Sequence, residues 1–141
     1  MNLNLTNKVV VVTGAAGLQG SIGHSIVFAL AKEGAIPVLI DRNNRGFDYE
    51  KQLQEIHKEA TFYQTDLTIV SQIEDSITKV SQKFGRIDAI INNVGVNDGV
   101  SLEGTIDEFM DSLRLNLVSY FAVVKYALPL LKKSRGTILN I

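Results

Sequence analysis

The sequence predicts a single α/β domain built on a doubly wound parallel sheet. Short apolar runs of β-type residues alternate with longer stretches of helical periodicity along all 141 residues. The runs are apolar at consecutive positions, which is expected where helices cover both faces of a sheet. Strict alternation of strands and helices requires crossover connections, and these give parallel strands with right-handed crossovers.

These patterns predict about five strands and four helices. The strands are expected at Lys8–Thr13, Ile36–Ile40, Thr61–Gln64, Ile87–Asn92 and Thr137–Ile141. The helices are expected at Ser21–Glu33, Tyr49–Lys58, Ile69–Phe84 and Thr105–Lys133.

Local signals agree with these boundaries. Gly34 and Gly85 follow the first and third helices as terminators. The segment from Thr105 to Glu108 has the capping-box pattern, which marks the start of the last helix. Pro37 lies inside the second apolar run and is tolerated only near the start of that strand.

Composition places the chain among ordinary globular proteins, with residues 1–141 as one domain. It is 45% hydrophobic and 21% charged, and a net charge of -1 gives no electrostatic reason to expect nucleic acid as a partner. The chain contains no cysteine, which excludes disulfides and thiolate zinc sites. His24 and His57 lack the spacing of a metal-binding pair, so no metal site is expected.

No targeting or membrane segment is predicted. The N-terminus has no apolar core of the kind that a signal peptide needs. Lys125 and Pro129 interrupt the most apolar later stretch, Leu117–Leu131, which falls short of the ~20 residues of a membrane span. We therefore expect a cytoplasmic protein without a membrane partner.

The stretch Val9–Gly23, VVVVTGAAGLQGSIG, carries the strongest functional signal. A buried strand runs into a helix through a turn that holds four glycines, Gly14, Gly17, Gly20 and Gly23. Such a turn aims the first free N–H groups of the helix at one point, where a phosphate can bind. Glycines let the backbone approach a pyrophosphate and adopt the positive φ of tight turns. The stretch therefore predicts a dinucleotide site.

Asp41 ends the second strand, 21 residues after Gly20. An acidic residue at this place in the fold accepts hydrogen bonds from the hydroxyls of the adenosine ribose. Its charge would repel a 2′-phosphate, which favours NAD over NADP, whereas the nearby Arg42 and Arg45 argue for the reverse. The alternative is an aspartate that only opens a turn.

Two further polar segments follow strands. Asp66 and Leu67 end the third strand, where the adenine ring would lie, but an Asp before a helix is equally well an N-cap. Asn92, Asn93 and Gly95 follow the fourth strand, where short amides can bond a ligand or form an ordinary Asn-rich turn.

Together these motifs resemble the N-terminal half of a short-chain dehydrogenase/reductase. The resemblance spans nearly the whole chain and includes the glycine turn, the strand-end Asp, DLT, NNVG, and Asn116 in the last helix before ILNI. It implies a Rossmann-like sheet of order 3-2-1-4-5 that is incomplete at its C-terminal edge. It also implies that Asn116 belongs to the catalytic group, where it supports a water beside the catalytic lysine. The residues expected to bind the cofactor are Gly14, Gly17, Gly20, Ser21, Ile22, Gly23, Asp41, Arg42, Asp66, Leu67, Asn92, Asn93 and Gly95.

The glycine turn departs from the family pattern. If Ile22-Gly23 is the usual terminal pair, about three extra residues precede it, and Ser21 stands where a glycine is common. If Gly14, Gly17 and Gly20 form the set, the spacing resembles the extended, nucleotide-sugar-modifying branch. NNVG and Asn116 favour the shorter branch, but which glycines contact the pyrophosphate stays open.

The family's catalytic Tyr-x-x-x-Lys is not found in this sequence. None of the four tyrosines has a lysine at the fourth following position, and Tyr120 and Lys125 are five residues apart. The resemblance therefore implies that this chain carries only the cofactor-binding half and is inactive alone. It leaves Thr137–Ile141 as an open sheet edge. A broad apolar surface on the last helix predicts a homo-oligomer, or contact with a further part of the same protein.

The function expected from the resemblance is NAD-dependent hydride transfer to or from a secondary alcohol or ketone, with a sugar or polyol as an option. Two alternatives stay open: a catalytically inactive nucleotide-binding or interaction module, and a nucleotide-sugar epimerase or dehydratase of the extended branch. The sequence does not identify the substrate.

Overall fold

The computed structural model describes residues 3–141, and its core is one five-stranded parallel sheet. The strand order is β3-β2-β1-β4-β5, and all four neighbouring pairs are parallel. The strands are β1 (Val9–Thr13), β2 (Ile36–Asp41), β3 (Thr61–Gln64), β4 (Ala89–Asn92) and β5 (Thr137–Asn140). The predicted fold class and strand order are confirmed.

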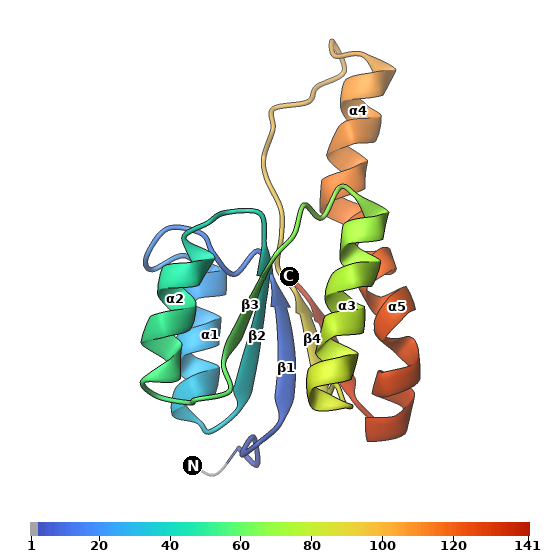
Figure 1. Ribbon diagram of the computed structural model, residues 1–141. Helices are drawn as coiled ribbons and strands as arrows, with labels where there is room; N and C mark the ends of the chain where they lie inside the picture. The colour runs from blue at the N-terminus through green and yellow to red at the C-terminus, as the bar shows by residue number, and fades with distance from the viewer. Residues whose placement is uncertain (1–2) are drawn as a thin grey trace.

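Helices cover both faces of the sheet. They are α1 (Ile22–Lys32), α2 (Gly46–Gln54), α3 (Val70–Phe84), α4 (Ile106–Leu113) and α5 (Ser119–Ser134), with the π-helical turn η1 (Arg114–Val118) between the last two. Figure 1 shows α1 and α2 on one face of the sheet and α3 and α5 on the other.

Two apolar cores result from this layering, and β1 contributes to both. Val9 and Val11 pack with the side chains of α3 and α5, whereas Val10 and Val12 pack with those of α1 and α2. All four side chains are at most 2% exposed. The continuous apolarity of this strand thus has a simple cause, since its alternate side chains enter two different cores.

Pro37 occupies the second position of β2 without costing a ladder hydrogen bond. The Ile36 N–H donates to Lys8 O on the β1 side, so the Pro37 nitrogen faces the β3 side. Because β3 pairs with β2 only from Val38 onward, no carbonyl of β3 lies opposite this nitrogen. The expectation that proline is tolerated near the strand start is confirmed.

The second helix was predicted at Tyr49–Lys58, and this range is wrong at both ends. The helix begins earlier because Asn43 Oδ1 accepts the Arg45 N–H at 3.0 Å, which starts a turn. Gly46 then packs so tightly on Phe62 that a Cβ there would lie 2.2 Å from the ring. A glycine in this place is a weak helix signal, so the periodicity alone misses it.

The last predicted helix, Thr105–Lys133, is continuous but not uniform. Its capping box is present, with Thr105 Oγ1 accepting the Glu108 N–H and Glu108 Oε2 accepting the Thr105 N–H. The run Ile106–Ser134 is long and apolar enough to cross a membrane by length and composition, although core helices pass the same test. The expectation of no membrane partner stays a prediction.

Burial falls off toward one side of the molecule. α5 buries Ala122, Val123, Ala127 and Leu131 against the sheet, whereas α4 has no buried residue. Figure 1 shows α4 projecting beyond the carboxyl edge of the sheet. The four residues of β5, the edge strand, are all exposed. The predicted open edge is thus present.

Asp88 joins the amino-terminal ends of β1 and β4. Its carboxylate accepts the Val9 N–H at 2.9 Å and the Arg86 Nε–H at 2.8 Å, and its side chain is only 8% exposed. Burial opposes ionisation, but the hydrogen bonds from Arg86 and Val9 and the positive charges of Arg86 and Lys8 leave the pKa of this carboxyl below its usual value.

Replacing Asp88→Asn is expected to lower the free energy of unfolding by about 1.5 kcal/mol near neutral pH, a usual value for a hydrogen bond to a charged group. A carboxyl with a lowered pKa in the folded state stabilises above its unfolded pKa and loses that effect as the pH falls through the folded pKa. The difference from the unaltered chain, measured by urea unfolding, should therefore shrink as the pH falls below the unfolded aspartate pKa of about 3.9. Asp75→Asn, in an exposed pair with Lys79, should have little effect. An equal difference in unfolding free energy at neutral and at acidic pH would contradict this role of the Asp88 carboxylate.

Candidate functional site

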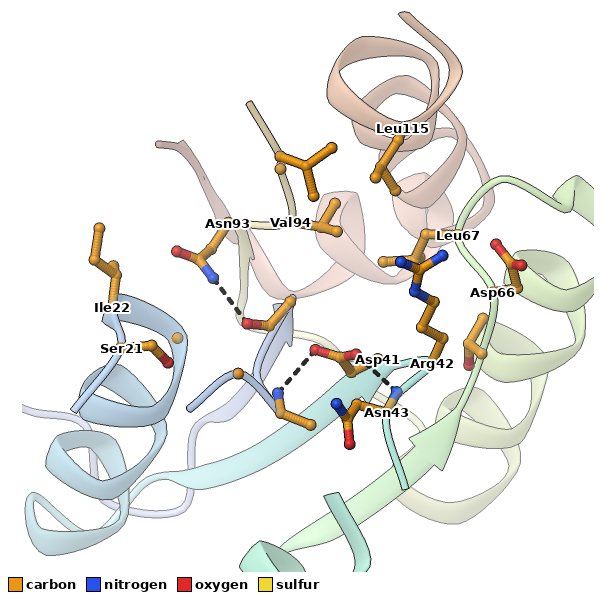
Figure 2. A pocket seen from close by; sticks show the side chains of 17 residues that line it. Ser21, Ile22, Asp41, Arg42, Asn43, Asp66, Leu67, Asn93, Val94 and Leu115 are labelled. Atoms are coloured by element: carbon orange, nitrogen blue, oxygen red, sulfur yellow. Dashed lines mark hydrogen bonds between the residues drawn. The ribbon is translucent and has the colours of Figure 1, made fainter. Parts of the chain in front are cut away.

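The carboxyl ends of four strands surround one cavity of about 630 Å³, here called the carboxyl-edge cavity. The turn after β1 and the ends of β2, β3 and β4 form its walls, as Figure 2 shows. Of the residues predicted to bind a cofactor, those that line it are Gly14, Gly17, Ser21, Ile22, Gly23, Asp41, Arg42, Asp66, Leu67, Asn93 and Gly95. Gly20 and Asn92 do not line it. The fold thus brings together side chains from four separate parts of the sequence.

Gly14 and Gly23 allow the turn, α1 and the loop after β4 to meet at close range. Gly14 has φ +64°, and a Cβ there would lie 2.7 Å from Val94 Cα. A Cβ on Gly23 would lie 2.2 Å from Gly14 O and 2.7 Å from Asn93 Nδ2. No larger side chain fits at Gly23 without moving backbone.

The extra residues of the turn fold away from the cavity. Leu18 O accepts the Ser21 N–H at 2.9 Å, which closes a β-turn with Gly20 at φ +82°. Leu18 is 73% exposed, and nothing lies within 4 Å of a Cβ built on Gly20. Gly14, Gly17 and Gly23 therefore face the cavity, and Gly20 does not.

The start of α1 presents hydrogen-bond donors at the cavity wall that have no partner among residues 3–141. The first helical bond runs from the Ser25 N–H to Ser21 O, so the N–H groups of Ile22, Gly23 and His24 have no intrahelical partner. Ser21 is the N-cap but makes no capping bond with its side chain. Its Oγ is buried and has no hydrogen-bond partner among the described residues.

Asp41 connects the end of β2 to the glycine turn. Its Oδ2 accepts the Ala16 N–H and its Oδ1 accepts the Asn43 N–H, both at 2.9 Å. Figure 2 shows these two bonds as dashed lines, with the carboxylate at the cavity floor. Each carboxylate oxygen has a second acceptor position, so Asp41 can hold the turn and still accept from a ligand.

Asp66 also forms a local turn. Its Oδ1 accepts the Thr68 Oγ1–H at 2.6 Å and the Thr68 N–H at 2.9 Å. These bonds from Thr68, with a smaller effect of the Arg42 charge and against the opposing effect of burial, lower the pKa of the Asp66 carboxyl. The N-cap of α3 is Ile69, so the predicted alternative of Asp66 as a plain N-cap is wrong. Leu67 is 4% exposed and lines the cavity beside it.

The two asparagines after β4 point in different directions. Asn93 Nδ2 donates to Thr13 O at 3.1 Å and to Gly14 O at 3.0 Å. Thr13 Oγ1 in turn accepts the N–H groups of Asn93 and Val94, at 3.1 and 3.2 Å. Asn92 is fully buried in the sheet, where its Nδ2 donates to Asn140 Oδ1 at 2.9 Å. Asn93 therefore ties β4 to the glycine turn, and Asn92 ties β4 to β5.

Asn116 lies in η1, outside the cavity lining. Its Oδ1 accepts the Val96 N–H at 2.9 Å, and its Nδ2 donates to Ser112 Oγ at 3.2 Å. A Cβ on Gly95 would lie 3.2 Å from Asn116 Oδ1. The side chain thus holds the loop after β4 against the long helix.

Sequence reasoning missed several residues of the lining. Leu115 reaches the cavity from η1, opposite Asp41, as Figure 2 shows. No local pattern distinguishes it from the other apolar positions of that helix. Asn43 could have been suspected from its place beside Asp41. The remaining members are Ala16, Thr65, Val94 and Val96. Among residues 3–141, no group of His, Asp or Glu could hold a metal ion.

Comparison with known proteins gives a consistent result. The family model described as short chain dehydrogenase matches residues 8–141. L-fucose dehydrogenase of Oryctolagus cuniculus is 35% identical over 136 residues, which cover 95% of this chain and 46% of that protein. This chain spans about half the length of the curated relatives that it matches.

Solved structures share the fold. Cj0485 dehydrogenase superposes with a TM-score of 0.92 and 38% sequence identity, covering 99% of this chain and 53% of that one. The NADH-dependent reductase A1-R′, solved in complex with NAD, gives a TM-score of 0.81 at 26% identity, over 99% of this chain and 61% of that one.

Thr13→Val is expected to cost about 2 kcal/mol of unfolding free energy, because it leaves two N–H groups without their acceptor. Thr13→Ser keeps the hydroxyl and loses one methyl group, so its cost should stay near ~0.8 kcal/mol. Urea unfolding followed by circular dichroism measures both variants. Equal stability of the two would show that the hydroxyl does not hold the loop after β4.

Gly20 and Gly23 should respond differently to alanine. Gly23→Ala is expected to cost about 3 kcal/mol, because its Cβ would overlap the Gly14 carbonyl. Gly20→Ala meets open space and should cost only about 1 kcal/mol, from its left-handed backbone. The same unfolding measurement applies, and a reversed order of the two costs would refute the geometry described for the turn.

Proposed function

This chain belongs to the short-chain dehydrogenase family, and we propose that it supplies the NAD-binding half of an oxidoreductase. The proposed reaction is hydride transfer between nicotinamide and a secondary alcohol or ketone. The relatives that the chain matches are oxidoreductases that act on small molecules. A sugar is the substrate class we favour, because L-fucose dehydrogenase is among those relatives.

The observation that carries the proposal is the set of donors and acceptors that converge on the carboxyl-edge cavity. At one end lie the free N–H groups at the start of α1 and the unpartnered Ser21 Oγ. A dianionic pyrophosphate fits these donors, since the helix N-terminus also carries partial positive charge. Gly17 contributes by its lack of a side chain, because a Cβ there would lie 2.6 Å from Ser21 Oγ.

Asp41 would accept from the ribose hydroxyls of the adenosine. Its two oxygens are fixed in place by Ala16 and Asn43, so no reorganisation is needed for a ligand to bind. A 2′-phosphate at this position would meet a carboxylate, which supports NAD over NADP. Arg42 also lines this cavity, and its positive charge argues for the reverse preference.

Asp66 and Leu67 would bound the adenine ring, with the apolar wall completed by Leu115 across the cavity. Asp66 Oδ1 is occupied by Thr68, which leaves Oδ2 as the acceptor for an exocyclic amino group. Asn116 would act indirectly, by holding the Val96 N–H and the loop that runs beside the nicotinamide.

When bound, NAD would supply the hydride acceptor at its nicotinamide ring. The proton of the substrate alcohol needs a general base, and no tyrosine of this sequence has a lysine four positions later. We therefore propose that this chain binds the dinucleotide but does not turn over an alcohol by itself. A cytoplasmic location and a homo-oligomer remain part of the proposal; the exposed apolar side chains of α4 and α5 support the latter.

Calorimetric titration tests the cofactor assignment. The unaltered chain should bind NADH saturably and more tightly than NADPH. Asp41→Asn should weaken NADH binding about tenfold and narrow its advantage over NADPH, because charge-assisted bonds to the ribose are lost. Asp107→Asn, on the exposed face of α4, serves as the control. Lack of saturable binding at about millimolar NADH, or an unchanged affinity in Asp41→Asn, would count against the proposal.

An activity assay tests the rest of the proposal. Incubation of the chain with NAD and L-fucose or a simple secondary alcohol should give no NADH. Steady NADH formation that Asn116→Ala abolishes would mean that the chain carries its own acid/base group.

A further inference from the structure

The bulge of the glycine turn, Gly17 to Gly20, is held from outside the cavity by two side chains. His24 Nδ1 accepts the Gly20 N–H at 3.3 Å, and the Tyr49 hydroxyl donates to Gly17 O at 2.9 Å. These contacts attach the bulge near both of its ends. Neither His24 nor Tyr49 lines the carboxyl-edge cavity.

The two side chains support each other through ring contacts. The His24 imidazole lies 4.8 Å from the Tyr49 ring in an edge arrangement and 4.6 Å from the Phe28 ring. Tyr49 is 6% exposed, so α2 fixes its position against α1. The Nδ1 atom of the imidazole is the acceptor of the Gly20 N–H. The rings thus aim one acceptor and one donor at the bulge.

Few other contacts attach the bulge to the rest of the protein. Leu18 is largely exposed and Gly20 faces open space. Across residues 3–141, the bonds from His24 and Tyr49 are the only side-chain hydrogen bonds made to the backbone of Gly17 to Gly20. The Leu18–Ser21 bond closes the bulge on itself but does not attach it to the rest of the protein.

The position of the bulge decides what faces the cavity. Ser21 directly follows Gly20, and its unpartnered Oγ lies beneath Gly17. If the Gly17 peptide rotated, its carbonyl oxygen could turn toward a bound anion and repel it. With the carbonyl held by Tyr49, the anion meets Ser21 Oγ and the N–H groups of α1 instead.

We propose that His24 and Tyr49 are positioning residues for the pyrophosphate. They hold the Gly17 carbonyl and the Gly20 amide away from the cavity, so that Ser21 Oγ and the first amides of α1 are aimed at the anion before it arrives. This role rests on the dinucleotide binding proposed above. It extends the phosphate site to the side chains of a histidine and a tyrosine, which lie outside the cavity lining.

Three variants test the proposal by NADH titration. His24→Leu and Tyr49→Phe each remove one bond to the bulge, and each should raise the Kd for NADH about fivefold. His24→Asn places an amide oxygen where Nδ1 lies, so it should restore most of the affinity that His24→Leu loses. A role limited to packing would not be rescued in this way, since Asn is smaller and more polar than Leu.

Matched controls are available in the same chain. His57 Nδ1 also accepts a nearby N–H, from Glu59 at 3.4 Å, but lies at the other end of β3, so His57→Leu should leave the Kd unchanged. Tyr126 lies on α5 and packs against the core on the other face of the sheet, so Tyr126→Phe is the control for Tyr49→Phe. Urea unfolding checks that each variant is folded. If Tyr49→Phe is not folded, the comparison of His24→Leu with His24→Asn decides the question.

Amide hydrogen exchange at Gly20, followed by NMR in the chain without ligand, gives a readout independent of binding. Exchange should be faster in His24→Leu than in the unaltered chain and slow again in His24→Asn. If the unaltered chain binds NADH and the variants bind equally well, the positioning role is overturned while the proposed function stands. The positioning role is also overturned, while the proposed function stands, if His24→Asn binds NADH as weakly as His24→Leu does. Failure of the unaltered chain to bind NADH overturns the proposed function, and the positioning role with it.

Discussion

The contact between the end of β1 and the end of β4 is the constraint on which the site depends. Thr13 Oγ1 accepts two N–H groups from the loop after β4, and Asn93 returns two hydrogen bonds to the backbone of Thr13 and Gly14. Gly23 packs against the same point from α1. The end of β1, the start of α1 and the loop after β4 therefore meet without a gap, and together they line the cavity. A looser junction would leave the free amides of α1 without a defined direction.

Several polar side chains in this cavity have a structural task as well as a place facing the ligand space. Asp41 holds the glycine turn through Ala16, and Asp66 closes a turn through Thr68. Because these bonds exist before any ligand binds, the carboxylates are fixed in advance, which lowers the cost of binding. It also means that altering either residue disturbs the backbone as well as the contact. Binding and stability measurements are therefore needed together.

The molecule is unevenly buried from one edge of the sheet to the other. β1 and β2 are covered on both faces, whereas β5 is exposed along its length and α4 buries nothing. Phe109, Met110, Leu117 and Phe121 expose 48–69% of their surface on the long helix. Apolar surface of this extent is typical of contact with further protein. The strands that are buried most deeply, β1 and β2, also carry the glycine turn and Asp41 of the candidate site.

The sequence by itself determined the order of strands and helices and the residues that stand at the strand ends. These are local properties, because periodicity and turn chemistry act over a few neighbouring residues. Tertiary structure decided which of those residues face the cavity. Asn92 still belongs to β4 and points into the sheet, whereas Asn93 lies just beyond it and reaches the turn. Gly20 looks like the other glycines of the turn in the sequence, yet it lies outside the cavity lining, where its N–H donates to His24. Leu115 lines the cavity only because the tertiary structure brings η1 beside it. Such choices depend on the direction of each side chain relative to distant segments, and a linear pattern does not contain that direction.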